Sequence, residues 1–397
     1  MSENSPKRVV IVVENLPSPF DRRVWQEATT LAKHDYEVSI VCPTGKGYES
    51  KYEYLENVHI YRFNLPLEAD GAIGYAIEYA WALVMQFLLV SWIALRRGID
   101  VIHACNPPDN IFMLALPFKL FGVKFLFDHH DINPELYEAK FGRKDFFYRV
   151  MLAWERWTFR TADVSIATNE SYKQIAVERG GMHPDDVFIV RSGPDLSRLT
   201  ILPANNERKK GRDYLVGYVG VMGKQEGIDL LLDSVRVLVH EQNRTDIQFC
   251  LVGSGTALDE MRELAKSLKI EDFVDFTGRV SDKELLEILN SSDICVNPDR
   301  VNAMNDKSTM NKIMEYMALA KPIVQFDLTE GRFSAQQASV YAKENDRVDF
   351  ANKISTLLDD PLAREKMGKF GHERVKNKLA WDFQIQPLLG AYQRILR

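Results

Sequence analysis

Apolar and polar positions alternate between strand-like and helix-like patterns along the first half of the chain. Residues 8–14 (RVVIVVE) form a continuous β-branched run, which is typical of a strand buried on both faces of a parallel sheet. Residues 22–33 place apolar side chains at helical spacing, and residues 36–42 (YEVSIVC) return to a strand-like run, so the three segments predict a βαβ unit. Further strand-like runs lie at residues 59–63, 100–104, 124–128 and 164–168. The first half therefore predicts a doubly wound α/β sheet.

The periodic pattern fails between residues 191 and 212, where Gly, Pro, Asn and a basic cluster are typical of a linker. A second series of strand-like and helical segments follows. Its strand-like runs lie at residues 214–219, 247–252, 274–276, 294–296 and 322–325. We expect an N-terminal Rossmann-like domain over residues 1–195, a linker over 196–212 and a C-terminal Rossmann-like domain over 213–376.

Residues 79–95 (YAWALVMQFLLVSWIAL) form a nearly continuous apolar run with three interpretations. The run lies at the lower limit for crossing a bilayer, but it contains Gln86 and lies between two predicted strands of one sheet. A buried core helix and a helix with one face on a membrane surface are the alternatives. The run ends in Arg96 and Arg97, and residues 140–160 mix cations with aromatic side chains, which suits an anionic interface. We expect peripheral contact with the cytoplasmic face of a membrane, with an ordinary core helix as the alternative.

Composition and charge exclude some partners. With 397 residues the chain exceeds what one hydrophobic core usually supports, in agreement with two domains. A net charge of −6 gives no general attraction to nucleic acid, so we expect no nucleic-acid partner. The four cysteines lie far apart beside apolar runs, and the N-terminal segment has no signal-peptide pattern. We therefore expect buried thiols and a cytoplasmic protein.

Ligands of open α/β sheets bind beyond the carboxyl ends of the strands, so the loops after the predicted strands are candidate sites. In the second half, residues 220–227 (GVMGKQEG) follow such a strand. Gly220 and Gly223 let the backbone approach a phosphate closely, and Lys224 adds a positive charge for it. A tight βα turn without a ligand is the alternative interpretation of these glycines.

A second loop of the C-terminal half combines a helix start with a carboxylate. Lys307, Ser308 and Thr309 precede a helical run in which Glu315 lies opposite an apolar stripe. Ser308 or Thr309 is expected to cap this helix, whose N-terminal dipole stabilises a diphosphate. Glu315 either accepts hydrogen bonds from two ribose hydroxyls or is an ordinary solvated glutamate.

Polar residues also follow three predicted strands of the N-terminal half, where an acceptor can bind. They are Asp21, Arg22, His103, Asn106, Asp109, His130, Asp131 and Glu135. The sequence His129-His130-Asp131 taken alone suggests a metal site, but adjacent histidines of an extended segment point to opposite faces. Since no further histidine lies at ligand spacing, we expect no metal site.

Several longer phrases make the chain similar to a known family. They are ENLPSPFDRRVWQEA, FDHHDINPELY, IVRSGPDLSRL, LVGSGTALDEM, FVDFTGRVSDKELLEILNSSDICVNP and MEYMALAKPIV. Together they resemble the family 4 retaining glycosyltransferases of the GT-B fold, in particular members that assemble cell-surface polysaccharides. The resemblance implies two Rossmann-like, doubly wound parallel-sheet domains that face each other across a cleft. It also implies that residues 377–397 form a helix that packs back on the N-terminal domain.

The resemblance implies a chemistry as well. A sugar would pass with retained configuration from a nucleotide-sugar, here a UDP-sugar, to a saccharide or lipid-linked saccharide acceptor. No metal or cofactor would be needed, because basic side chains and a helix N-terminus neutralise the departing diphosphate. By the same resemblance Glu315 holds the ribose, Arg279 and Val280 lie against the base, and Lys224 is the cation nearest to the diphosphate.

In the N-terminal half the resemblance assigns catalysis to one loop. His130 falls where family members place a histidine near the reacting sugar, and Asp131 orients its ring. The other polar strand-end residues of this half would then contact the acceptor; they are Asp21, Arg22, His103 and Glu135.

The chain departs from the family pattern around the diphosphate. Lys307 stands eight residues before Glu315, where the family usually has a glutamate that touches the donor sugar. Val221 and Glu226 stand where the family usually has an arginine and a lysine. Lys307 therefore either binds a carboxylate on a uronic acid donor or contacts the diphosphate in place of the missing cation.

Two other functions are compatible with the same residues. A nucleotide-sugar epimerase shares the two-domain architecture, and the acceptor-side residues of the first half favour transfer over epimerisation. An inactive sugar-nucleotide-binding subunit is the other alternative, because Lys307 replaces a carboxylate of the family pattern.

Overall fold

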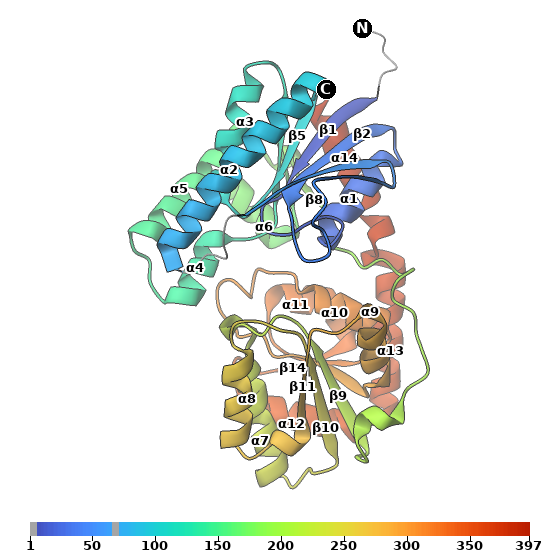
Figure 1. Cartoon of the computed structure of the whole chain (residues 1–397). Coiled ribbons are helices and arrows are strands. Elements are labelled where there is room, and N and C mark those ends of the chain that lie inside the picture. Colours follow the sequence, from blue (N-terminus) through green and yellow to red (C-terminus); the bar gives the residue numbers. More distant parts are fainter. Residues whose placement is uncertain (1–5, 66–70) are drawn as a thin grey trace. The chain divides into compact units, whose positions relative to one another are not determined.

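The computed structural model describes residues 6–65 and 71–397, and the chain forms two compact units (Figure 1). The first unit extends to Ser192 and also contains Gln384–Arg397, whereas the second unit is Gly193–Phe383. Each unit is built on a mostly parallel sheet covered by helices. The predicted α/β class with two Rossmann-like sheets is therefore confirmed.

The sheet of the first unit has, over the described residues, the strand order β3-β4-β2-β1-β5-β6-β7-β8. Its strands are β1 (Lys7–Val12), β2 (Tyr36–Pro43), β3 (Tyr52–Leu55), β4 (Val58–Phe63), β5 (Val101–Cys105), β6 (Lys124–His129), β7 (Val164–Ala167) and β8 (Val187–Ile189). Neighbouring strands pair in parallel, except that β3 and β4 are antiparallel. All six predicted strands of this half are present. Only the short edge strands β3 and β8 were not predicted, since a few residues carry too little periodicity.

Helices cover both faces of this sheet (Figure 1). On one face lie α2 (Gly71–Arg96), α3 (Phe112–Lys119) and α5 (Phe146–Thr161), with the ring of Phe159 5.0 Å from that of Phe127 in β6. On the other face α1 (Arg22–Ala32) contacts α14 (Ile385–Ile395), and Tyr392 of α14 reaches His103 of β5. The remaining helices, α4 (Asn133–Phe141) and α6 (Glu170–Gln174), follow β6 and β7. The loops that follow the strands therefore lie between a face covered by α2, α3 and α5 and a face covered by α1 and α14.

Helix α2 packs one face on the sheet and leaves the opposite face open to solvent. Ala82, Gln86, Val90 and Ile93 are buried, and the helix runs beside β2 and β4. By length and composition residues 77–96 could cross a membrane, and 22% of the most apolar window is buried. Helix α2 therefore has one buried face on the sheet and a largely exposed opposite side, and its contact with a membrane stays a prediction.

The sheet of the second unit is entirely parallel, with the order β11-β10-β9-β12-β13-β14 in the described residues. Its strands are β9 (Tyr214–Val219), β10 (Ile247–Val252), β11 (Val274–Gly278), β12 (Ile294–Asn297), β13 (Ile323–Phe326) and β14 (Ser339–Ala342). Its helices are α7 (Ile228–Arg236), α8 (Leu258–Ser267), α9 (Asp282–Ser291), α10 (Asn311–Ala318), α11 (Thr329–Ala335), α12 (Arg347–Leu358) and α13 (Pro361–Arg374). A core with the fully buried rings of Tyr218, Phe249, Phe326 and Phe350 holds the layers together.

The unit boundaries differ from the expected domain limits. The chain leaves the first unit at Ser192, before the expected linker, and residues 196–212 pack on the second unit. The backbone N–H of Leu202 donates to Asn290 at 2.9 Å, and that of Asn205 donates to Ser291 at 2.9 Å. The chain returns to the first unit at Gln384 rather than at residue 377. The loss of periodicity indicates a segment without strands or α-helices, and hydrogen bonds to side chains of α9 (Asp282–Ser291) attach this segment to the second unit.

Candidate functional site

In the first unit, β6 delivers two histidines to opposite faces of the sheet. His129 is fully buried beside Phe127, Phe159 and Tyr172, with ring centroids 5.1 to 5.5 Å away. His130, the next residue, lies on the other face, and its side chain is 15% exposed. Extended backbone alternates its side chains, so only His130 is available to a ligand.

His130 belongs to a buried ionic network. Its Nε2 lies 2.6 Å from Oδ2 of Asp128 and 2.9 Å from Nε of Arg23, and the Arg23 guanidinium lies 2.9 Å from Oδ1 of Asp128. Burial would raise the pKa of Asp128, but Arg23 and His130 outweigh it and hold that pKa well below its usual range. Burial raises the pKa of Glu27 well above normal, and the Arg23 guanidinium at 3.1 Å offsets part of the shift. His130 is therefore held by a carboxylate that stays ionised.

Two groups of side chains in this region have metal-ligand spacing. They are His103 with Cys105 and Asp128, and Glu27 with Asp128 and His130. The guanidinium of Arg23 contacts both carboxylates of the second group and already supplies the positive charge that they require. The donor set thus fits a metal poorly, and a metal-independent reaction stays a prediction.

Asn106 organises the loop that carries His130 and Asp131. Its Oδ1 accepts hydrogen bonds from the backbone N–H groups of His130 at 2.7 Å and Asp131 at 3.1 Å. Its Nδ2 donates to Asp109 and to the carbonyl of Asp131. Burial raises the pKa of Asp131. Among the described side chains, Asp128 and Arg23 lie within hydrogen-bond distance of the His130 ring. Asn106 and Asp128, rather than Asp131, thus fix His130 in place.

The other predicted acceptor-side residues have varied environments. Asp21 caps α1 by accepting from the backbone N–H of Val24 at 3.2 Å, and Arg22 is exposed. His103 is fully buried in the network, and Glu135 is buried in an ion pair with Arg179 at 2.7 Å. The sequence predicted Arg22 as an acceptor-side residue, whereas its neighbour Arg23 is the arginine that contacts Asp128 and His130. The helical face of α1 could have indicated this, since Val24 and Ala28 mark its buried side.

In the second unit, the glycine loop after β9 is tightly packed. A Cβ at Gly220 would lie 2.4 Å from the hydroxyl of Tyr218, and Gly227 has φ +65 with the carbonyl of Pro298 against it. Substitution at either position would clash or strain the backbone, which supports the tight-turn interpretation. A Cβ at Gly223 would meet only the flexible side chain of Gln225, and the residue itself is buried.

A second cation beside this loop is Lys312 of α10, which the sequence did not indicate. Lys224 has an 82% exposed side chain 3.6 Å from Glu260. Lys312, by contrast, is buried, with its Nζ 2.8 Å from Glu226 and 3.1 Å from Asp299. Burial would raise the pKa of Glu226, but Lys312 outweighs this effect and lowers it. Glu226, which stands where the family usually has a lysine, is thus paired with a lysine from another element.

Glu315 lies one turn after Lys312 on α10. Its Oε1 accepts from Arg198 at 2.8 Å, and its side chain is 17% exposed, so it is neither free nor an ordinary solvated glutamate. Capping of α10 by Ser308 or Thr309 is wrong: the N-cap is Met310, with no side-chain cap bond. The Ser308 hydroxyl donates instead to the carbonyl of Met304 at 2.8 Å, because the loop ends in a turn before the helix begins.

Arg279 and Val280 directly follow β11. Arg279 is exposed, and Val280 packs against a small core with Leu215 and Ile288. Both residues therefore lie at the carboxyl end of the sheet, as a base-binding role requires. Lys307 is half-buried in the loop after β12.

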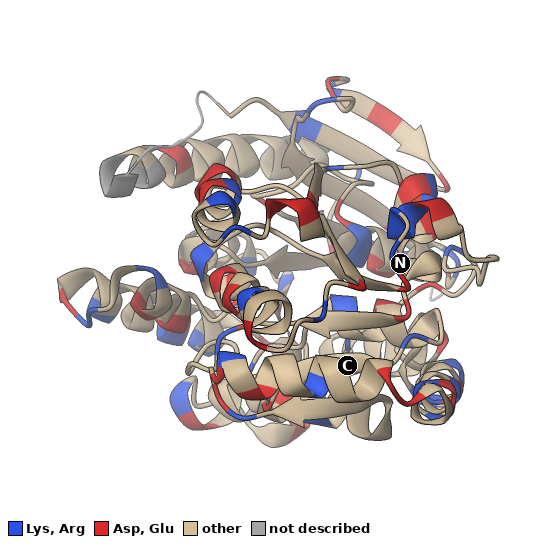
Figure 2. Cartoon of the chain, turned by 90° about the horizontal axis from the view of Figure 1, so that it is seen from below, with Lys and Arg blue, Asp and Glu red and all other residues tan. Residues whose placement is uncertain are grey.

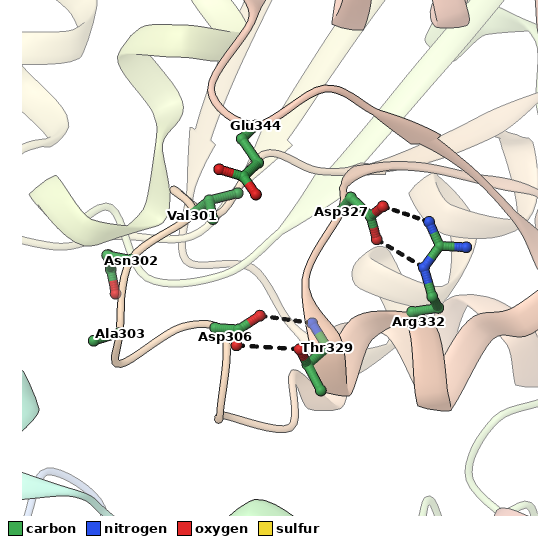
Figure 3. A pocket seen from close by; sticks show the side chains of 8 residues that line it. All are labelled: Val301, Asn302, Ala303, Asp306, Asp327, Thr329, Arg332 and Glu344. Atoms are coloured by element: carbon green, nitrogen blue, oxygen red, sulfur yellow. Dashed lines mark hydrogen bonds and ion pairs between the residues drawn. The ribbon is translucent and has the colours of Figure 1, made fainter.

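A pocket of about 580 Å³ opens beside these loops (Figure 3). It is lined by Val301, Asn302, Ala303, Asp306, Asp327, Thr329, Arg332 and Glu344. Asp306 accepts from the backbone N–H and hydroxyl of Thr329 at 2.8 and 3.1 Å, and Asp327 pairs with Arg332. None of the predicted donor residues lines this acidic pocket. The donor site that the sequence predicts by α10 and the glycine loop is therefore separate from this pocket, and it stays a prediction.

Similarity to solved structures agrees with this architecture. A sucrose-phosphate synthase from Thermosynechococcus elongatus has a TM-score of 0.79 at 17% identity, with 98% of both chains covered. The HepE protein of Anabaena in complex with UDP has a TM-score of 0.74 at 13% identity, covering 98% of this chain and 99% of that one. At these identities the likeness shows the fold, which is the GT-B fold of glycosyltransferases.

Sequence comparisons are more specific. Residues 21–198 match the family model described as Glycosyltransferase Family 4, and residues 213–360 match the one described as Glycosyl transferases group 1. The chain belongs to the family 4 glycosyltransferases.

Two curated relatives show the range of this family. A mannosylfructose-phosphate synthase of Agrobacterium fabrum is 25% identical over 261 residues, which are 62% of this chain and 56% of the relative. The chain thus spans little more than half the length of that relative. A capsular polysaccharide biosynthesis glycosyltransferase of Staphylococcus aureus is 22% identical over 391 residues, 92% of each chain.

Proposed function

We propose that the protein transfers a sugar, with retention of configuration, from a UDP-sugar to a saccharide or lipid-linked saccharide acceptor in surface polysaccharide biosynthesis. The observation that carries the proposal is the partly buried ion pair of Arg198 with Glu315, because ligands of open α/β sheets bind beyond the carboxyl ends of the strands. The similarity to a fold neighbour solved with UDP and to a capsular polysaccharide enzyme supports the donor and the pathway class.

The residues of each unit suggest how the reaction proceeds. In the second unit, Glu315 accepts hydrogen bonds from the ribose, while Arg279 and Val280 lie beside the base. Lys312, which lies beside the glycine loop, stabilises the charge of the diphosphate as the glycosidic bond breaks. In the first unit, His130 acts beside the transferred sugar, held by the ionised Asp128.

Nucleotide binding tests the donor half of this proposal. Glu315→Ala should weaken UDP binding about tenfold or more in calorimetry, because two hydroxyl hydrogen bonds to a charged acceptor are lost. Glu263→Ala is the matched control, since Glu263 pairs with Lys266 on the exposed face of α8. Equal UDP affinity in all three proteins would refute the role of Glu315.

We also propose that the protein binds the cytoplasmic face of a membrane through α2. Its exposed residues form an apolar stripe at helical spacing: Ile77, Trp81, Val84, Leu88, Trp92 and Leu95, which are 44 to 88% exposed. The only charged residues of the helix are Glu78 and Arg96, and it is almost uncoloured in the charge view of Figure 2. A helix on a water-facing surface normally exposes a polar face, so this stripe requires a cover.

The neighbouring helices extend this apolar stripe and add positive charge. On α3 and just after it Leu116, Leu120 and Phe121 are exposed, and on α5 Trp157 is exposed. Arg149, Arg156 and Arg160 are exposed on α5, and Arg96 lies over the ring of Trp92 at 5.8 Å. Tryptophan with arginine beside exposed leucine suits the interface of an anionic bilayer, where a lipid-linked acceptor would be held.

A further inference from the structure

A series of side chains within hydrogen-bond distance of one another connects the last helix of the protein to His130. The hydroxyl of Tyr392 in α14 lies 2.8 Å from Nδ1 of His103, and Nε2 of His103 lies 3.4 Å from Oδ2 of Asp128. The same carboxylate oxygen lies 2.6 Å from Nε2 of His130. Tyr392, His103 and Asp128 are fully buried, and only His130 reaches solvent. All four residues belong to the first unit, although 289 positions separate Tyr392 from His103 in the sequence.

The ring proton of His103 is fixed by its neighbours. Burial lowers the pKa of His103, so the ring is neutral and carries one proton. An ionised carboxylate only accepts, and Asp128 stays ionised, so the proton resides on Nε2, 3.4 Å from Oδ2 of Asp128. Nδ1 is then an acceptor. The hydroxyl of Tyr392 must donate to it, which burial favours by keeping the pKa of that hydroxyl far above normal.

We infer that Tyr392 is a positioning residue for His130: its hydroxyl selects the Nε2–H tautomer of His103, which helps to hold Asp128 against His130. The inference rests on the proposed role of His130 in sugar transfer. It assigns the C-terminal helix a part in the active site of the first unit, beyond packing against β7 and β8.

Removal of the hydroxyl would disturb each step of the chain. Nδ1 of His103 would be a buried acceptor without a donor, which favours moving the proton to Nδ1. The lone pair of Nε2 would then face the ionised carboxylate of Asp128 and repel it. Asp128 would keep Arg23 as its partner and shift away from His103, and the 2.6 Å contact with His130 would change with it.

The test compares Tyr392→Phe with Tyr36→Phe. The ring of Tyr36 lies 5.2 Å from that of Tyr392. The control therefore removes a neighbouring phenolic hydroxyl that does not belong to the series Tyr392, His103, Asp128 and His130. Nitrogen-15 NMR of the histidine rings should show His103 protonated on Nε2 in the wild type and in Tyr36→Phe, and on Nδ1, at least in part, in Tyr392→Phe. With a UDP-sugar, kcat of Tyr392→Phe should fall about tenfold, while the Kd for UDP stays unchanged.

Three results would overturn the inference. The wild-type spectrum alone contradicts it if His103 carries its proton on Nδ1, whether or not any variant folds. An unchanged tautomer in Tyr392→Phe, or an equal loss of kcat in Tyr36→Phe, also contradicts it. Failure of the proposed function is separate: His130→Ala with undiminished turnover would remove the catalytic role, while the tautomer result would still stand.

Discussion

At the residue scale, Lys307 has two alternative roles in donor binding: contact with a carboxylate on the sugar or contact with the diphosphate. If Lys307 binds the carboxylate of a uronic acid, Lys307→Glu should lose UDP-glucuronate selectively and retain or gain UDP-glucose. The charge-assisted hydrogen bond at stake contributes about 1.5 to 3 kcal/mol, which is roughly tenfold or more in Kd. If Lys307 instead neutralises the diphosphate, UDP and both UDP-sugars should weaken together.

Calorimetric titration of UDP, UDP-glucose and UDP-glucuronate distinguishes these roles. Lys369→Glu is the matched control, because it reverses the charge of an exposed lysine on α13. We propose the uronate role, because Lys307 replaces a residue that usually touches the sugar. Uniform weakening of all three ligands would contradict it.

His129 gives the protein an acid-sensitive core. Burial, with a smaller contribution from Arg179, lowers the pKa of His129 to about 3 from its ordinary 6.5. Below pH 6.5 the unfolded chain therefore binds a proton on His129, whereas the folded chain does not. The free energy of unfolding is not reduced by this residue above pH 6.5, and it decreases as the pH falls towards 3. At about pH 4.5 the loss is on the order of 2 to 3 kcal/mol.

Replacing the ring should remove part of this sensitivity. His129→Phe keeps an aromatic ring among Phe127, Phe159 and Tyr172, so its urea midpoint should fall less between pH 7 and about pH 4.5 than that of the wild type. His183→Ala is the control, since the His183 side chain is 67% exposed. Parallel losses in the wild type and His129→Phe would show that His129 is not the source.

At the scale of elements, α2 shows where sequence patterns stop being informative. Its apolar residues predicted a helix, but they occupy every side of it, so no periodicity distinguished the packed face from the open one. The start of α10 shows a second limit. Ser308 and Thr309 satisfy the capping pattern, yet Met310 is the N-cap, because the Ser308 hydroxyl donates to the carbonyl of Met304 in the preceding loop.

Membrane binding through α2 is a prediction for the same element. The double variant Leu88→Glu with Leu95→Glu should reduce the partition into anionic liposomes at least about tenfold, because each inserted leucine contributes on the order of 1 to 2 kcal/mol. The matched control, Val348→Glu with Leu362→Glu, places charges on exposed apolar residues of α12 and α13. Flotation with anionic and neutral liposomes measures the difference, and equal recovery of both double variants would contradict the proposal.

At the scale of the whole molecule, local patterns predicted both sheets, because a parallel strand is a continuous apolar run and each βαβ unit repeats it. They did not predict the network around His130. Arg23, His103, Asp128 and Tyr392 come from α1, β5, β6 and α14, and only the folded sheet brings them together. Lys312 was missed for the same reason, since its partner Glu226 lies 86 residues away.

The most direct test of the central claim is transfer of labelled sugar from a panel of UDP-sugars to a membrane lipid extract, in the presence of EDTA. The wild-type protein should form a labelled saccharide or lipid-linked product detected by mass spectrometry, and His130→Ala should form little of it while binding UDP normally. The claim would be contradicted if the label remained on the nucleotide, as an epimer or unchanged, with every donor. Loss of transfer in EDTA that magnesium or manganese restored would contradict its metal independence.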